Sequence, residues 1–368
     1  MRLISVSQRG LMALGLAAVM LGSSACADSD QPAGGDGKSA DEGFKVGLLL
    51  PESKTTRYEA FDKPLIEAKL KELCAKCEVL YQNADQDSTK QQSQADAMLT
   101  QGVKVLILDA VDAKAAAGIV SQAKEQKVPV VAYDRLASGP VDYYVSYDNR
   151  TVGETQGKAL LEALEAGGDA KRGQIVMING APTDPNAADF KAGAHSVLDG
   201  KVNLGKEYDT PDWSPDKAQQ QMEQAITAIG KDKIIGVYAA NDGTAGGAIA
   251  AMKSAGISKL PPVTGQDAEL AAIQRILAGQ QYMTVYKAIK PEADIAADMA
   301  IALATGKKYQ GETVTKNNGD QDVPSVLLQP VSVTKENVKD TIIADKFYTA
   351  DQICAGEYAK ACQAAGIS

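Results

Sequence analysis

Histidine and aromatic side chains are scarce in this chain. Its 368 residues include one histidine, His195, and only 5% phenylalanine, tryptophan and tyrosine together. A single histidine argues against zinc or iron sites built from imidazoles and against a Ser-His-Asp triad. We therefore expect no metal site and no catalytic residues, and we interpret His195 as an exposed helix residue without a role.

Positive charge is also in deficit. The chain has 38 lysines and arginines against 47 aspartates and glutamates, a net charge of −9, which argues against nucleic acid or anionic lipid as a partner. The segment GGDGKS resembles a phosphate-binding loop, but Pro32 occupies the place of its first glycine, so we expect no cofactor. With 45% hydrophobic residues the chain is too apolar to be disordered, and it is long enough for two domains.

The apolar run near the N-terminus is short. Leu11–Leu21 comprises eleven uncharged residues, whereas crossing the ~30 Å core of a bilayer takes ~20. Arg2 and Arg9 precede this run and small residues follow it. The pattern predicts a signal peptide over residues 1–25 and export across the cytoplasmic membrane.

Two ways of processing this signal peptide fit the residues. Cys26 follows small residues as in a bacterial lipobox, although Ser23 stands where leucine is usual, and it would then be the lipidated first residue of the mature chain. The alternative is cleavage after the Ala-x-Ala pattern at 25–27. The composition of residues 26–43 favours the lipoprotein, because it is typical of a flexible tether. We expect a periplasmic or cell-surface protein whose only membrane contact is its lipid anchor.

Five cysteines support an exported protein. If Cys26 carries a lipid, four remain in two close pairs, which predicts the disulfides Cys74–Cys77 and Cys354–Cys362. The CAKC motif also has the spacing of a thioredoxin-like redox site, but such a site opens a helix and Cys74 lies near the end of a predicted one. A zinc site of all four thiols fits an oxidising compartment poorly.

Short apolar runs alternate with amphipathic segments from Lys45 onward. The expected strands are 45–50, 78–82, 104–109, 129–134, 143–148, 174–180, 202–209, 233–242, 261–267 and 282–287, with an extended tail over 323–334. Helical patterns between these strands predict parallel sheets covered by helices on both faces. The alternation restarts beyond Asn149, so we expect an α/β fold with two doubly wound lobes.

Polar, forked and aromatic side chains follow these strands at what should be the same end of both sheets. They include Lys54, Arg57, Tyr58, Asp134, Arg135, Asp184, Asn186, Trp213, Asn241, Gln266, Asp267 and Lys287. Ligands of open α/β sheets bind at the carboxyl ends of the strands. Carboxylates and amides orient the hydroxyls of a sugar, cations donate charge-assisted bonds, and an aromatic ring packs on its C–H face. The set therefore favours a small polyhydroxylated ligand.

Each of these residues also has a plainer interpretation. Asp134 and Arg135 could form a surface ion pair worth about 0–1 kcal/mol, and Asn241 could be an ordinary helix N-cap. Asp148 is better explained as a turn between lobes than as a ligand contact. Trp213, which lies between two prolines in PDWSPDK, is harder to explain as core.

Several short segments carry a family resemblance. They are AYDR (132–135), SYDN (146–149), AANDGTAGGAI (239–249), TGQDAEL (264–270), MTVYK (283–287) and NNGDQDVPS (317–325). In order and spacing they resemble the D-xylose-binding proteins of bacterial ABC sugar importers, which are type I periplasmic binding proteins. The resemblance extends from about Phe44 to the region of Phe347.

The resemblance implies two lobes joined by three crossovers, near Asp148, Lys287 and Val323. The N-terminal lobe would comprise 44–147 and 289–322, and the C-terminal lobe 148–288 and 323–368. Family sugar contacts map onto Lys54, Arg57, Tyr58, Asp134, Arg135, Asn186, Trp213, Asn241, Asp267 and Lys287. The implied function is that of a monomeric binding protein, not an enzyme, which captures a monosaccharide between its lobes and delivers it to an ABC permease.

The chain departs from the family in its first loop. The family carries two arginines and a tryptophan there, whereas this chain has Lys54 and Tyr58 in place of one arginine and the tryptophan. Lysine cannot reproduce the fork of a guanidinium group, so D-xylose is favoured while another aldose remains open. A sugar sensor that feeds a chemoreceptor and a sugar-active enzyme are two further functions that the residues allow. Against the enzyme, each cleft carboxylate has a cation or amide beside it, which favours a permanently ionised acceptor.

Overall fold

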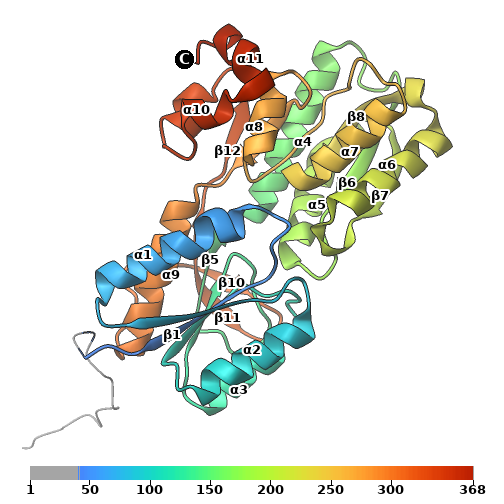
Figure 1. Ribbon diagram of the computed structural model, residues 1–368. Coiled ribbons are helices and arrows are strands. Elements are labelled where there is room, and N and C mark those ends of the chain that lie inside the picture. The colour runs from blue at the N-terminus through green and yellow to red at the C-terminus, as the bar shows by residue number, and fades with distance from the viewer. Residues whose placement is uncertain (1–39, 41, 368) are drawn as a thin grey trace, which may run out of the picture. The chain divides into compact units, whose positions relative to one another are not determined.

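Parallel β-sheets covered by helices make up the described part of the chain, which is residue 40 and residues 42–367 of this computed structural model (Figure 1). The predicted signal peptide, Cys26 and nearly all of the predicted tether lie outside these residues. The alternation of strands and helices expected from Lys45 onward is confirmed. Within residues 42–367, no helix has the length and apolar character needed to cross a bilayer.

The first lobe is built on a seven-stranded sheet. In spatial order its strands are β10 (Val314–Asn317), β11 (Asp322–Leu328), β5 (Tyr143–Tyr147), β4 (Val130–Tyr133), β3 (Val105–Leu108), β1 (Lys45–Leu50) and β2 (Glu78–Asn83). The helices α1 (Lys63–Leu73) and α9 (Ile289–Ala304) cover one face, and α2 (Ser88–Thr100) and α3 (Ala117–Glu125) cover the other (Figure 1). Alternate residues of β1 face opposite cores, so Leu48 packs under α1 and α9 while Leu49 packs under α2 and α3.

The second lobe combines a parallel and an antiparallel sheet. The parallel sheet has the order β7 (Leu204–Asp209), β6 (Gln174–Asn179) and β8 (Ile234–Ala239), and β12 (Val331–Thr334) pairs antiparallel with β9 (Met283–Tyr286). One face of the parallel sheet is covered by α4 (Asn149–Ala166) and α5 (Pro185–Leu198), the other by α6 (Pro215–Ile229) and α7 (Asp242–Ser254). The helices α8 (Leu270–Leu277), α10 (Ala350–Ile353) and α11 (Ala359–Ala364) pack with β9 and β12 into a separate core.

One predicted strand, at 261–267, does not form. The segment makes only single bridges, from Val263 to β8 and from Gln266 to β9. Pro261 and Pro262 lack the N–H groups that a ladder requires, and Asp267 has a left-handed φ of 88°. The segment therefore runs alongside the sheet as a connection and ends in a tight loop.

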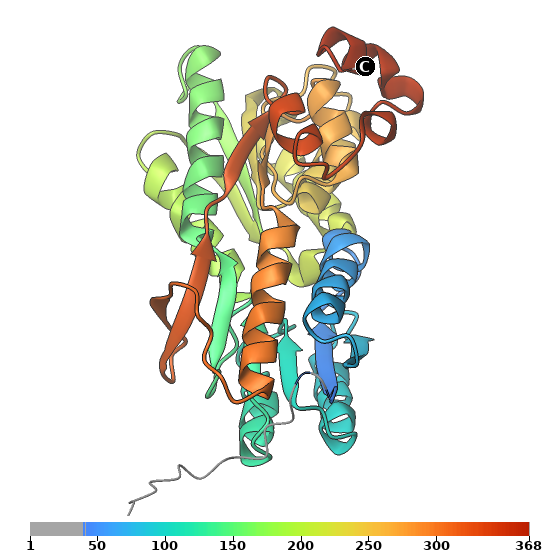
Figure 2. The ribbon, with the colours of Figure 1, turned by 90° about the vertical axis from the view of Figure 1, so that its left-hand side faces the viewer.

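The chain passes between the lobes three times. It leaves the first lobe between β5 and α4, returns between β9 and α9, and leaves again between β11 and β12 (Figure 2). The first two passages lie at the residues expected from the sequence. The third lies beyond Leu328 and not near Val323, because β11 pairs in parallel with β5 as far as Leu328.

Two disulfides brace the ends of short helices. Cys74 follows the last residue of α1 and is joined to Cys77, with the Cα atoms 5.3 Å apart. Cys354 follows α10 and is joined to Cys362 on α11, with the Cα atoms 5.7 Å apart. Cys74 thus ends a helix and does not open one, unlike the attacking thiol of a thioredoxin-like site.

An aromatic contact joins the lobes away from their sheets. Phe61 lies in η1 (Tyr58–Asp62), a short π-helix that precedes α1. Its ring stacks on Phe347, with centroids 4.3 Å apart and planes 18° apart, and meets the edge of Tyr348. Phe347 in turn packs against Tyr286 of β9. The first lobe therefore contacts the C-terminal segment of the second through stacked rings.

Candidate functional site

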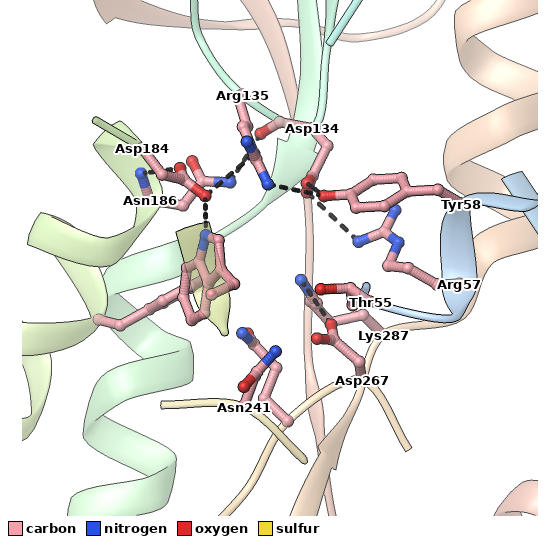
Figure 3. A pocket seen from close by; sticks show the side chains of 13 residues that line it. Thr55, Arg57, Tyr58, Asp134, Arg135, Asp184, Asn186, Asn241, Asp267 and Lys287 are labelled. Atoms are coloured by element: carbon pink, nitrogen blue, oxygen red, sulfur yellow. Dashed lines mark hydrogen bonds and ion pairs between the residues drawn. The ribbon is translucent and has the colours of Figure 1, made fainter. Parts of the chain in front are cut away.

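A small polar cavity lies between the lobes at the carboxyl ends of their strands (Figure 3). Its walls are Thr55, Arg57, Tyr58, Asp134, Arg135, Asp184, Asn186, Phe190, Trp213, Asn241, Gln266, Asp267 and Lys287. The space free of protein atoms within these walls is about 270 Å³, part of which is open to solvent. The cavity therefore suits a ligand of few atoms.

Arg57 is fixed by carboxylates of its own lobe. Its Nε and Nη2 donate to the two oxygens of Asp62, at 3.0 and 2.6 Å, and Nη2 also donates to Glu292 Oε2 at 3.0 Å. The remaining nitrogen, Nη1, faces Asp134 Oδ1 at 3.4 Å. Because the guanidinium is held on one edge, its other edge is aimed at the cavity.

Tyr58 and Asp134 form the next part of the same wall. The Tyr58 hydroxyl donates to Asp134 Oδ2 at 3.3 Å and accepts from Arg135 Nη2 at 3.1 Å. Asp134 follows β4 with a left-handed φ of 55°, a conformation that aspartate tolerates better than most residues. That turn places Asp134 and Arg135 side by side at the cavity (Figure 3).

The carboxylate of Asp134 stays ionised although it is buried. Burial alone would raise its pKa, but Arg57, Lys287 and Arg135 together outweigh burial and hold the pKa below its usual value. The residue is therefore a hydrogen-bond acceptor at neutral pH and is poorly suited to act as an acid.

The second lobe presents amides and aromatic rings. Asn186 lies in the first turn of α5, and its Nδ2 crosses the cleft to donate to the Asp134 carbonyl at 3.0 Å. Trp213 donates through Nε1 to Asp184 Oδ2 at 3.1 Å, which fixes the plane of the indole. Phe190 meets that ring edge-on, with centroids 6.3 Å apart. A Cβ added at Gly180 would lie 2.0 Å from the indole, so glycine is needed there for Trp213 to take this position.

Asn241, Asp267 and Lys287 close the remaining side. Asn241 caps α7 through a bond from Thr244 N–H to its Oδ1, which leaves its amide nitrogen directed toward the cavity (Figure 3). Lys287 Nζ lies 3.2 Å from Asp267 Oδ1, and both side chains are buried. Burial lowers the pKa of Lys287, but Asp267 and Asp134 outweigh it and raise the pKa, so the lysine remains charged.

The charges on the cavity wall balance. Three cationic groups, Arg57, Arg135 and Lys287, stand against the carboxylates of Asp134, Asp184 and Asp267. Since each cation has a carboxylate within 3.5 Å, a ligand with net charge would disturb existing ion pairs. An uncharged ligand with several hydroxyl groups would leave these pairs intact and use their remaining donors and acceptors.

Nine of the ten contact residues expected from the sequence line this cavity. They are Arg57, Tyr58, Asp134, Arg135, Asn186, Trp213, Asn241, Asp267 and Lys287. The structure places Lys54 elsewhere, with its side chain exposed to solvent. The reason lies in the turn after β1, where Glu52 accepts hydrogen bonds from the N–H groups of both Lys54 and Thr55. That turn directs Thr55 inward and Lys54 outward.

Four wall residues are not among the ten contacts that the family resemblance implied, although Asp184 and Gln266 belong to the wider set of strand-end residues. Asp184 and Gln266 stand at strand ends, so their positions were visible in the sequence, but Asp184 also fits the role of an N-cap for α5, which it fulfils. Phe190 has the helical spacing of an ordinary core residue. Thr55 gave no signal. Helical periodicity does not reveal which core residue also faces a cavity.

His195 differs slightly from expectation. It is half-buried on α5, with Nδ1 2.8 Å from Asp199 Oδ1 and Nε2 3.1 Å from Glu207 Oε1, and it does not line the cavity. Burial lowers its pKa, but these two carboxylates outweigh burial and raise it. Between residues 42 and 367 no group of three or more histidine, cysteine, aspartate or glutamate side chains is arranged to hold a metal ion.

Comparison with known sequences assigns the fold to a family. Residues 46–308 match the sequence family described as "Periplasmic binding protein domain". The chain belongs to the periplasmic binding proteins. Among curated members, it is 39% identical to the D-xylose-binding periplasmic protein of Escherichia coli, covering 84% of this chain and 92% of that protein. It is 33% identical to the multiple sugar-binding periplasmic receptor ChvE of Rhizobium radiobacter, covering 86% and 93%.

Solved structures of periplasmic binding proteins share the fold. An ABC transporter solute-binding protein of Clostridium phytofermentans with bound β-D-glucose is 31% identical, with a TM-score of 0.76, covering 84% of this chain and 99% of that one. A carbohydrate transporter solute-binding protein of Chloroflexus aurantiacus in complex with D-glucose is 28% identical, also with a TM-score of 0.76. The type I architecture expected from the sequence is thereby confirmed.

Proposed function

We propose that this periplasmic binding protein captures a neutral monosaccharide, D-xylose first among the aldoses, and delivers it unchanged to an ABC permease. The observation that carries the proposal is the cavity itself. Buried ion pairs surround it on one side, and Trp213 and Phe190 offer apolar faces on the other. A pyranose has the matching surfaces, because its hydroxyls lie around the rim and its C–H groups lie on the faces.

The similar proteins agree on sugars as the ligand class but differ in the individual sugar that they bind. The D-xylose-binding periplasmic proteins of Escherichia coli and Haemophilus influenzae are 39% and 37% identical to this chain. The structures with bound D-glucose lie further away, at 31% and 28%. Xylose is therefore the first candidate and glucose the second. Tyr58 stands where the xylose-binding relatives are expected to carry tryptophan. The relative affinities for xylose and glucose therefore have to be measured.

Closure of the lobes is the proposed mechanism. The cavity wall draws Arg57, Tyr58 and Asp134 from the first lobe and Trp213 and Asn241 from the second. Only a closed arrangement lets both sets touch one ligand, so the ligand favours closure by its higher affinity for that state. The permease would then recognise the closed, loaded monomer.

We also propose that the mature chain starts at a lipidated Cys26. The support is the lipobox-like sequence before it, and the residue lies outside the described part of the chain. Metabolic labelling with a radioactive fatty acid in a bacterial host should label the parent chain and leave Cys26→Ala unlabelled. Equal labelling of both would reject the anchor, and an unlabelled parent would favour the Ala-x-Ala route.

A sugar panel tests the proposed function. The fluorescence of Trp213, the single tryptophan, should change when xylose is added, and calorimetry should give one site per chain. Glucose, ribose and arabinose should bind more weakly. Tighter binding of glucose would overturn the choice of xylose, and no response to any aldose would overturn the sugar class. Sugar recovered after incubation should be chemically unaltered, and any product would favour a sugar-active enzyme.

A further inference from the structure

Asp242 is a buried carboxylate directly behind the cavity. It is the first residue of α7, is 0% exposed, and is not among the residues that line the cavity. Its Oδ2 accepts from the Glu269 N–H at 2.9 Å and from the Thr284 hydroxyl at 2.8 Å. Its Oδ1 accepts from Gln281 Nε2 at 2.7 Å. One carboxylate thus collects donors from the start of α8, from β9 and from the turn before β9.

The loop that these donors hold is strained. Asp267 and Ala268 both have left-handed φ angles, 88° and 50°, and neither is glycine. Such conformations are unfavourable for residues other than glycine and persist where surrounding contacts over-determine them. Two hydrogen bonds supply these contacts here. The Asp267 N–H donates to the Val285 carbonyl at 2.9 Å, and the Ala268 N–H donates to Thr284 Oγ1 at 3.2 Å. Thr284 therefore links the strained residues directly to Asp242.

The chain also approaches Asp242 from the residues just before this loop. The Asp242 N–H donates to the Gln266 carbonyl at 3.0 Å. A Cβ added at Gly265 would lie 2.0 Å from Asp242 Oδ1, so the close approach needs glycine. Asp242 is thus hydrogen-bonded to the chain on both sides of Asp267. Before Asp267 it contacts Gln266, and after Asp267 it contacts Glu269 directly and Ala268 through Thr284.

We propose that Asp242 is the positioning residue that fixes Asp267 relative to Asn241 for ligand binding. Asn241 is its neighbour in the chain, and Asp267 belongs to the loop that it holds, so the two second-lobe contacts share one anchor. The inference rests on the proposed function, because it assigns a role within the same site. It predicts that a residue that does not touch the ligand governs affinity.

The charges around Asp242 make the role testable by pH. The carboxyl groups of Asp267 and Glu269 face it and Tyr348 lies nearby, while the Arg275 guanidinium donates to the Asp242 carbonyl at 2.9 Å. Burial raises the pKa of Asp242 to about 7, although Arg275 and the Gln281 hydrogen bond act to lower it. An ionised carboxylate accepts all three donors, whereas a protonated one loses an acceptor. The hydrogen bonds that hold the loop should therefore change as the pH passes through 7.

The experiment compares Asp242→Asn with a matched control, Asp216→Asn. Asp216 lies in the first turn of α6, is exposed and is not among the residues that line the cavity, so its substitution repeats the loss of charge at a helix start. Xylose affinity would be measured by calorimetry at pH 6, 7 and 8.5. Asp242→Asn should bind at least 10-fold more weakly than the parent at pH 8.5 and should show a flatter pH profile. Asp216→Asn should match the parent throughout.

A second variant covers the case in which Asp242→Asn does not fold. Thr284→Val keeps the volume of the side chain and removes the hydroxyl that joins Asp242 to Ala268. It should weaken xylose binding at least threefold while the melting temperature stays within a few degrees of the parent. Parental affinity in Thr284→Val, or in a folded Asp242→Asn at every pH, would overturn the positioning role. A parent chain that binds no aldose would instead reject the proposed function.

Discussion

The two lobes contribute to the cavity in different ways. In the first lobe the ligand-facing groups hold one another: Arg57 is bound by Asp62 and Glu292, and Tyr58 is bound by Asp134. In the second lobe, two of the cavity residues have partners across the cleft. Asn186 donates to the Asp134 carbonyl, and Asp184 pairs with Arg135 at 3.0 Å.

This difference assigns separate tasks to the lobes. The first lobe is pre-organised around Arg57, because the ion pairs of Arg57 with Asp62 and Glu292 lie within that lobe whether or not the cleft is closed. The second lobe makes its contacts with Asp134 and Arg135 only when the cleft is closed, and one of its buried acceptors, Gln266 Oε1, has no hydrogen-bond partner within the described residues. We therefore expect substitutions in the first lobe to remove binding and those in the second to weaken closure.

Asp134→Asn should have the largest effect. Neutralising this carboxylate leaves Arg57 and Lys287 facing a cavity without their shared counter-charge, and breaking a buried pair costs about 3–5 kcal/mol. Xylose affinity measured by calorimetry should fall by roughly 100-fold or more. The control is Asp148→Ala, which removes the N-cap of α4 away from the cavity and should leave affinity nearly unchanged. Equal affinity in both variants would place the ligand outside this cavity.

Trp213→Ala should have an intermediate effect. The indole supplies a stacking face and buried area, together worth about 1–3 kcal/mol of binding. Calorimetry is needed here because the substitution removes the fluorescent reporter. Trp213→Phe should recover part of the loss, since it keeps an aromatic face and loses only the bond to Asp184. If Trp213→Ala binds xylose as the parent does, the second lobe does not stack on the ligand.

Each lobe contains a buried carboxyl group whose pKa makes the stability of the fold depend on pH. Burial raises the pKa of Glu292 in the first lobe to about 8, and that of Glu269 in the second to about 8. Both are raised relative to the unfolded chain, so the folded protein binds extra protons below pH 8 and loses that stability as the pH rises through 8. His195, whose pKa is also raised, acts in the same direction. The free energy of unfolding should fall between pH 6 and 9, at most by roughly 1.4 kcal/mol per pH unit for each proton.

Urea unfolding at several pH values measures this slope. Glu292→Gln and Glu269→Gln should each flatten it, and the larger flattening identifies the lobe that bears more of the buried charge. If the free energy of unfolding rose between pH 6 and 9 instead, the raised pKa values of Glu292, Glu269 and His195 would be contradicted.

Lys54→Ala should have the smallest effect. The side chain is exposed and does not reach the cavity, so xylose affinity should stay within twofold of the parent. Thr55→Val, its inward-facing neighbour, should weaken binding more. A 10-fold loss in Lys54→Ala would mean that the lysine turns into the cleft when the ligand is present, as the family resemblance implies.

Sequence patterns predicted the architecture well because strand and helix periodicities are local. The strands around Leu48 and Ile107 have uninterrupted apolar runs, which parallel sheets covered on both faces require. Most cavity residues were also predicted, since strand ends can be counted along the chain. The failures have a common cause. Whether 261–267 forms a strand, and whether the chain crosses between the lobes near Val323, both depend on which strand the segment pairs with.

The side-chain details of the cavity could not be predicted for the same reason. Whether Lys54 or Thr55 faces inward is decided by the carboxylate of Glu52, which accepts from both N–H groups of that turn. The role of Asp242 depends on donors from Glu269, Gln281 and Thr284, which a helix-start aspartate does not reveal in sequence. Such choices arise from tertiary contacts.

The third passage of the chain between the lobes has a consequence for the order of folding. β11 fills the sheet of the first lobe beside β5, and the loop before it bonds to the segment after β4, as when Asn318 donates to the Ala137 carbonyl across 181 positions of sequence. The lobe that begins first in the chain is therefore complete only after most of the second lobe has been synthesised, shortly before β12 and the C-terminal helices of that second lobe. Contacts of such long range slow folding. A growing chain should keep its first lobe incomplete, and hence unable to bind, until Leu328 has emerged.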